Sequence, residues 1–326
     1  MKRLLLALIA AGSSLTWGVA RPEEPQSIEF RMQPGESANY ALHVETRTEI
    51  TWHRPQGPET RTVHFQSEMK VLIRCAAITP EGVMRIEILY PDFHLETTVN
   101  ESGQTSRIVS DKAGARSYVN GKLQDTATWA QLEAQGRQNL PKLLAALIEF
   151  SLDNRGRVLD VKVPAALAGQ FSDTAIKQFF RQQVILPGVP IAPGSEWSDK
   201  TERTAAAGPS FMQGKTMIDE TAYTYKKIET VSGRECARIA ITVTSYPKEE
   251  IRDVKEFKQS SEGESLLALD NGQVVESYLN LSQEIQGTPG GVRAEAKTTG
   301  EVKTSLLPPA SEKSPGAQEG TATREK

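Results

Sequence analysis

Hydrophobic and polar residues alternate with a period of two between residues 40 and 53. The even positions are Tyr40, Leu42, Val44, Thr46, Thr48, Ile50 and Trp52, and the odd positions are Ala41, His43, Glu45, Arg47, Glu49, Thr51 and His53. Such alternation predicts a strand with one buried face. After the turn-forming residues 54–58, the apolar positions are odd-numbered, from Val63 to Cys75. A hairpin whose paired residue numbers sum to about 113 would place both apolar sets on one face, with His64 opposite Glu49.

The same apolar face continues through two more predicted strands. Residues 79–82 form a turn, and Met84, Ile86, Ile88 and Tyr90 follow it at period-two spacing. A separate strand is predicted for residues 93–99, after a break at Pro91-Asp92. The stretch up to residue 99 is therefore a predicted antiparallel meander with one apolar and one polar face.

Leucine spacing changes to a helical period between residues 129 and 150. Gly136 and Pro141 interrupt this pattern, so two short helices are predicted. A hairpin follows, from residues 150–152 to 158–163 around a turn at 153–156. Another helix is predicted for residues 172–183, with Ser172 as its N-cap.

Two turn signals occur twice in the same order. A Pro-Gly turn precedes a strand at residues 34–35 and again at 193–194, and an Asp-Asn turn occurs at 153–156 and again at 270–272. A duplicated unit is the simplest interpretation. The second copy has predicted strands at residues 222–231, 236–246, 267–269 and 274–285, and a last strand ending near 307. The predicted fold is mainly β (β-rich α+β), with two tandem related antiparallel β units forming a twisted sheet, half-barrel or sandwich. Short helices are inserted in and after the first unit.

The chain divides into five predicted segments. Residues 1–20 combine two basic residues, an apolar stretch and the small-residue ending Gly18-Val19-Ala20, which predicts a signal peptide. Its apolar run is too short to span a membrane, and no cysteine for a lipid anchor follows. We therefore expect an exported, soluble protein, periplasmic or extracellular. The other segments are a first β unit at 21–165 with a helical insertion at about 127–149, a helix and Pro-rich linker at 166–191, a second β unit at 192–307 and a disordered tail at 308–326.

Composition excludes several classes of function. The 326 residues include 38 basic and 41 acidic side chains, a net charge of −3, so the basic face that nucleic-acid binding requires is not expected. The chain has two cysteines, and export leaves two alternatives for them. Cys75 and Cys236 form a disulfide, or both are buried thiols on separate strands. The apolar pattern of both strands favours burial.

No motif for catalysis or cofactor binding is found. The chain contains no Gly-x-Ser-x-Gly turn, no phosphate-binding glycine loop and no histidine after His94. The four histidines, His43, His53, His64 and His94, fall on the polar positions of their strands near Glu45, Glu49 and Glu96. Because His-x-His and His-x-x-x-His spacings are missing, these residues are interpreted as a solvated sheet face, and no catalytic, cofactor or metal site is assigned.

Several short segments resemble an uncharacterised family of exported bacterial proteins, a domain of unknown function. These are Pro193 to Trp197 after residues 186–190, the strand start at Gly233 to Ala237, and the two Asp-Asn turns. The resemblance implies no catalytic or binding residue, since the family has no assigned activity. At the level of fold, an exported sheet with helices is also similar to lipoprotein carriers of the LolA type.

An apolar sheet face must be covered by helices, by another sheet or by a ligand. We therefore expect a non-catalytic protein that binds a lipid or other apolar small molecule. The alternatives are a structural or interaction protein with a partner in the bacterial envelope, and a hydrolase with a site between the two β units.

Overall fold

A computed structural model describes residues 24–101, 103–136, 140–144, 146–162, 184–204 and 214–308. In its N-terminal half the elements are β1 (Ser37–Arg54), β2 (Gly57–Ile78), β3 (Met84–Glu101), β4 (Gln104–Asp111), β5 (Gly114–Val119), β6 (Lys122–Thr128), α1 (Trp129–Ala134), α2 (Leu140–Leu144), β7 (Ile148–Leu152) and β8 (Val158–Lys162). In its C-terminal half they are β9 (Glu196–Thr204), β10 (Thr216–Val231), β11 (Arg234–Pro247), β12 (Val254–Ala268), β13 (Val274–Gly287), the short 3₁₀ helix η2 (Pro289–Gly291) and β14 (Arg293–Leu306).

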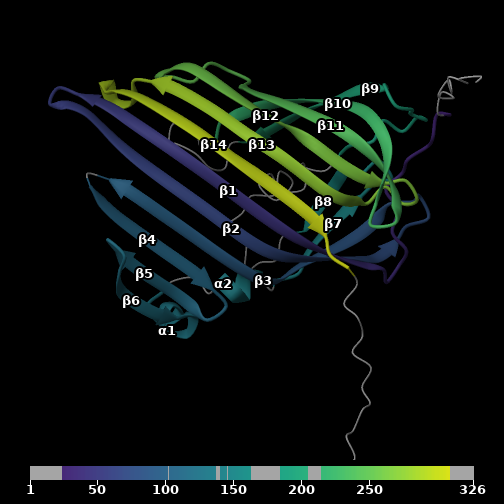
Figure 1. Cartoon of the computed structure of the whole chain (residues 1–326), viewed down its shortest axis with the longest axis horizontal. Helices are drawn as coiled ribbons and strands as arrows, with labels where there is room; N and C mark the ends of the chain where they lie inside the picture. The colour runs from purple at the N-terminus through teal and green to yellow at the C-terminus, as the bar shows by residue number, and fades with distance from the viewer. Residues whose placement is uncertain are drawn as a thin grey trace, which may run out of the picture.

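The strands form one antiparallel sheet rather than two separate ones. Its order is β6-β5-β4-β3-β2-β1-β14-β13-β12-β11-β10-β9, so the first and last strands pair at its centre (Figure 1). Strand β3 pairs with β2 along one edge. Along its other edge it has two partners, β7 beside its first residues and β4 beside its last. The mainly β prediction is confirmed, but the two predicted units share a sheet, and their duplication stays a prediction.

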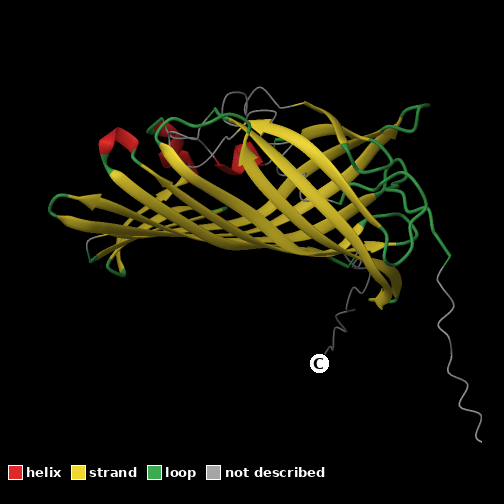
Figure 2. Cartoon of the chain, turned by 90° about the horizontal axis from the view of Figure 1, so that it is seen from above, coloured by secondary structure: helices red, strands yellow, loops and turns green. Residues whose placement is uncertain are grey.

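The sheet curves into an open trough with the helices on its concave side (Figure 2). The main apolar cluster lies on this inner face and joins residues from the whole length of the chain. It includes Tyr40 and Leu42 of β1, Ile86 of β3, Phe150 of β7 and Ile239 of β11. Because one face of a long sheet must be shielded from water, bending it around its own apolar side chains provides a core with few helices.

The β1–β2 hairpin has the predicted parity but a register shifted by two. Its paired residue numbers sum to 111 rather than 113, as in Tyr40 with Val71. The reason is the turn, which consists of only Pro55 and Gln56, with Gly57 at φ 123° starting the next strand. The pairing of His64 with Glu49 was therefore wrong, because His64 lies opposite Arg47.

Polar or interrupted sequences conceal several strands. Strand β3 continues through Pro91, where a bulge opposite β2 accommodates a residue that cannot donate a ladder hydrogen bond, so the predicted break was wrong. Strands β4, β5 and β6 and most of β12 were not predicted, because their alternation of apolar and polar residues is weak. The Ser232-Gly233 turn between β10 and β11 is confirmed, with positive φ at both residues, as a two-residue hairpin requires.

Residues 29–31, near the start of the described chain, contact both of the predicted Asp-Asn turns. The backbone N–H of Phe30 donates to the carbonyl of Asn154, at 2.8 Å, and that of Arg31 donates to Asn271, also at 2.8 Å. A Cβ at Gly272 would lie 2.5 Å from the carbonyl oxygen of Glu29, so only glycine permits this approach. The two repeated turn signals therefore meet on the same short segment.

The stretch predicted as a helical insertion contains α1 and α2. The predicted helix at 172–183, the signal peptide and nearly all of the tail lie outside the described residues. No described helix has the length and apolar character needed to cross a membrane.

Both cysteines are free thiols, and their side chains are fully buried in different apolar clusters. Burial raises the pKa of each thiol, which lowers its thiolate fraction at neutral pH.

We expect iodoacetamide to leave the native chain unmodified and to alkylate both cysteine thiols in urea without reductant, as measured by intact mass. Alkylation that requires reductant would contradict this expectation.

Candidate functional site

The inner face of strands β9 to β14 is organised in rows that cross the sheet. One row is apolar and aromatic, and each of its members is paired in register with the next. From the sheet edge inward it consists of Trp197, Tyr223, Ile241, Gly263, Leu279, Val302 and Val44. Cross-strand neighbours on one face lie in contact, so this row is a continuous apolar strip.

A polar row lies four residues farther along each strand on the same face. Its members are Thr201, Asp219, Ser245, Gln259, Gln283, Thr298 and Thr48, again each in register with the next. Beyond it lies a second apolar cluster, built around Met217, Ile251 and Ile285. The polar row is therefore set between two apolar regions, where side chains need hydrogen-bond partners to offset desolvation.

An ion pair joins Asp219 of the polar row to Arg203, which lies two residues beyond Thr201 on β9. The Nε of Arg203 donates to both carboxylate oxygens of Asp219, at 2.9 and 2.8 Å, and the two side chains are 14% and 13% exposed. The hydroxyl of Ser245 donates to Asp219 at 2.6 Å. The Nη2 of Arg203 and the amide of Gln283 each donate to the Oε1 of Gln259, at 3.4 and 3.0 Å.

Four of these side chains, those of Arg203, Asp219, Ser245 and Gln259, line a cavity of about 280 Å³ on the concave face. Its walls include the apolar residues Tyr223, Ile241, Val243, Leu279, Leu281 and Val302, and the polar residues Asp199, Thr201, Arg203, Asp219, Ser245 and Gln259. A guanidinium carries five N–H donors, and the bonds described above occupy two of its nitrogens, so Arg203 retains donors for a ligand. The cavity thus joins an apolar wall to a polar one.

Two stacked rings lie at the apolar end of the cavity, which Tyr223 lines. The ring centroids of Trp197 and Tyr223 lie 5.3 Å apart, and the angle between the ring planes is 16°. The indole N–H of Trp197 donates to the carbonyl of Ile185 at 2.7 Å, and Ile185 itself lines the cavity. Burial raises the pKa of Tyr223 to about 12, so this phenol stays neutral at physiological pH.

Sequence reasoning did not find this site. Asp219, Ser245, Gln259 and Gln283 fall at the inward positions of their strands, where a polar residue looks like a break in the apolar alternation. The usable signal was that the four breaks occur at matching heights on four neighbouring strands. Recognising it requires the register, which the sequence alone does not give.

The histidines lie on the other, outer face of the sheet, as their positions predicted. His53 pairs with Glu295, at 3.4 Å, and His94 lies 4.0 Å from Glu96. His43 lies between several glutamates, and His64 shares a hydrogen bond with Glu45. None of the four lines the inner cavity.

No protein-family model matches this chain, and no curated protein matches it. Among solved structures it is similar to a structure of lipid–protein interactions in lipovitellin, with 12% identity, 86% of this chain covered and a TM-score of 0.47. The match covers 26% of the lipovitellin chain, about a quarter of its length.

Two bacterial structures are similar at lower scores. One is a domain of an outer membrane lipoprotein-sorting protein from Vibrio parahaemolyticus, and the other is a DUF1329 family protein from Desulfovibrio piger. Each has 9% identity and a TM-score of 0.13, with 83% of this chain and 87% of the other covered. At these TM-scores none of the three similarities assigns a function.

Proposed function

We propose that the protein is a non-catalytic, exported carrier that binds a small amphipathic molecule in the cavity on the concave face of β9–β14. The observation that carries this proposal is the arrangement of the lining, in which an apolar wall and a polar row share one cavity. Seven of the fifteen lining side chains are apolar and eight are polar. Small-molecule sites combine apolar walls with placed polar groups in this way. Burial of the ligand's apolar part would supply the binding free energy.

The charges of the lining select the polar part of the ligand. Asp219 neutralises Arg203, and Asp199 contributes a further carboxylate to the cavity wall. An anionic headgroup would meet a site with two acidic groups and one basic group. Hydroxyl groups, by contrast, can donate to Asp199 and accept from Arg203. An uncharged polar group on an aliphatic chain, such as the glycerol of a monoacylglycerol, therefore fits this lining better than a fatty-acid carboxylate.

The cavity gives no comparable support to an enzyme or to a purely structural protein. Arg203 and Asp219 are held by each other, and the histidines that could serve as bases lie on the outer face. Partner binding at the sheet edges, among them β6 and β9, is the alternative function. This alternative predicts that filling the cavity leaves partner binding unchanged.

The proposal is tested by filling the cavity. The uncharged fluorescent probe N-phenyl-1-naphthylamine should bind the purified chain, and monolauroylglycerol should displace it better than laurate does. Val243→Trp places an indole in the cavity wall and should weaken probe binding at least about tenfold, because the probe and the new ring need the same volume.

Thr242→Trp is the matched control, since Thr242 is the adjacent residue of β11 and points to the exposed outer face. It should bind the probe like the unaltered chain. Equal probe binding by both tryptophan variants, with native circular dichroism, would sink the carrier proposal. Native mass spectrometry of chain purified after export without detergent should additionally show a retained small molecule.

A further inference from the structure

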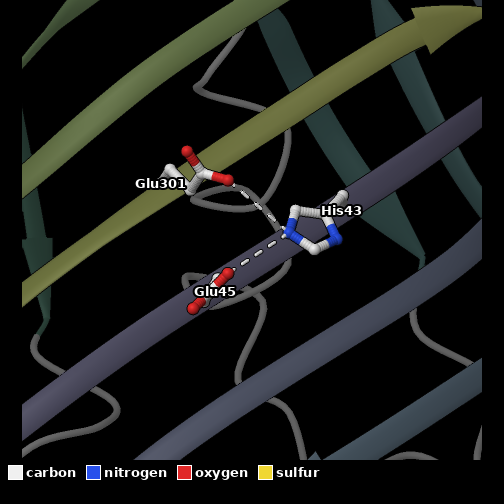
Figure 3. Close-up of side chains that lie close together, drawn as sticks. All are labelled: His43, Glu45 and Glu301. Atoms are coloured by element: carbon white, nitrogen blue, oxygen red, sulfur yellow. Dashed lines mark ion pairs between the residues drawn. The ribbon is translucent and has the colours of Figure 1, made fainter.

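A cluster of metal-binding side chain types lies on the outer face, where β1 meets β14. The Nε2 of His43 is 3.8 Å from a carboxylate oxygen of Glu45 and 3.7 Å from one of Glu301 (Figure 3). The three potential ligand atoms all lie within 4.8 Å of one another. Figure 3 shows the three side chains on the same face of the sheet, with both carboxylates reaching toward one edge of the ring.

The spacing of these atoms is close to that of a tetrahedral zinc site. Zinc binds imidazole nitrogen and carboxylate oxygen at about 2.0–2.2 Å, which places tetrahedral ligand atoms about 3.4 Å apart. The two distances from His43 to the carboxylates exceed this value by a few tenths of an ångström. The two carboxylate oxygens, which lie within 4.8 Å of each other, would also have to approach on binding. The side chains of His43 and Glu301 are each 27% exposed, and that of Glu45 is 44% exposed, so an ion and a water ligand have access.

The register also creates a charge conflict that a cation would relieve. Glu45 and Glu301 are direct cross-strand partners, and like charges in that position destabilise a sheet. Lys303 already pairs with Glu301, at 2.5 Å, and is the cation with which a metal would compete.

Neighbouring side chains hold the cluster in a suitable orientation. The Nδ1 of His43 faces Glu68, at 3.9 Å, so Nε2 is the ring nitrogen that faces Glu45 and Glu301. The Nε2 of His64 lies 2.8 Å from the other oxygen of Glu45. Hydrogen bonds of this kind to the outer atoms of ligands are a general feature of metal sites.

We propose that His43, Glu45 and Glu301 bind a divalent transition-metal ion, best matched by Zn²⁺, with water completing its coordination. The sequence contains no paired-histidine spacing, and the third ligand, Glu301, comes from the opposite end of the chain. Within the described sheet, the β1–β14 pairing joins β1–β6 to β9–β14. A bound ion would cross-link the two halves of the sheet at their junction.

The test is calorimetric titration of ZnCl₂ into the purified full chain after chelator treatment and dialysis at pH 7.5. We expect one Zn²⁺ per chain. His43→Ala and Glu301→Gln should each weaken the affinity at least about tenfold, since each removes a direct ligand. Lys303→Met should strengthen zinc binding several-fold, because it removes the competing cation without touching a ligand.

His53→Ala is the matched control. His53 lies on the same strand and face but contacts one carboxylate, that of Glu295, and its removal should leave zinc affinity unchanged. The gain expected for Lys303→Met separates the proposal from loss of folding. An unaltered chain that binds no zinc, or a His43→Ala variant that binds it with the original affinity, would overturn the site. Neither result bears on the inner cavity, which lies on the other face.

Discussion

Replacing Gly263 by alanine is expected to lower the free energy of unfolding by about 3 kcal/mol. Gly263 lies in the middle of β12 on the inner face, between Ile241 of β11 and Leu279 of β13. A Cβ at this position would lie 1.8 Å from the carbonyl oxygen of Tyr278, which is backbone and cannot rotate away. The strands would have to separate, at the cost of ladder hydrogen bonds and of the curvature that forms the cavity.

The measurement is urea unfolding followed by tryptophan fluorescence, in which the midpoint should fall. Ser261→Ala is the control, because Ser261 occupies the preceding inner-face position of the same strand and already carries a Cβ. Gly263→Ala should also bind N-phenyl-1-naphthylamine more weakly if it folds. Identical midpoints for the two variants would show that the strand spacing here is not restricted by the glycine.

This position illustrates how curvature is encoded. Gly300 of β14 is similarly restricted, since a Cβ there would lie 2.5 Å from the carbonyl oxygen of Glu45. Glycine inside a strand commonly marks a bend or a close backbone approach. From the sequence, however, Gly263 and Gly300 look only like weak points in polar strands. Their role depends on which strands lie beside them, and that is a long-range property.

Parity and turns could be predicted from the sequence because they are local. The alternation from Tyr40 to Trp52 correctly identified the inner and outer faces of β1, and Ser232-Gly233 correctly located a hairpin turn. The pairing of β1 with β14 has no local signal, since it joins residues such as Glu45 and Glu301 across nearly the whole chain. Without this pairing the chain looks like two units, and neither the cavity rows nor the zinc cluster can be assembled.

Removing the carboxylate of Asp219 is also expected to lower the free energy of unfolding strongly. Asp219→Ala leaves the guanidinium of Arg203 mostly buried without its ion partner, and it removes the acceptor for the hydroxyl of Ser245. Breaking a buried pair from one side costs several kcal/mol, because a desolvated charge remains uncompensated. We expect a loss of about 3 kcal/mol in the free energy of unfolding, measured by urea denaturation.

Removing both charges together should separate stability from ligand selection. The double variant Arg203→Leu/Asp219→Leu leaves no unpaired charge, so it should recover most of the stability lost in Asp219→Ala. Its cavity would still bind N-phenyl-1-naphthylamine, since the apolar wall from Tyr223 to Val302 is intact. In the unaltered chain, monolauroylglycerol should displace the probe better than dodecane does. In the double variant this difference should disappear, because the hydroxyl groups no longer meet the guanidinium.

The double variant therefore decides what the polar row contributes. If the ion pair only supports the sheet, the variant should retain the preference for monolauroylglycerol. If Arg203 receives the polar group of the ligand, the preference should fall while the probe still binds. The Glu220→Leu/Lys200→Leu variant is a matched control, because that pair also joins β9 to β10, at 2.7 Å, but on the outer face. It should change neither probe binding nor competitor preference, since both of its side chains lie outside the cavity lining.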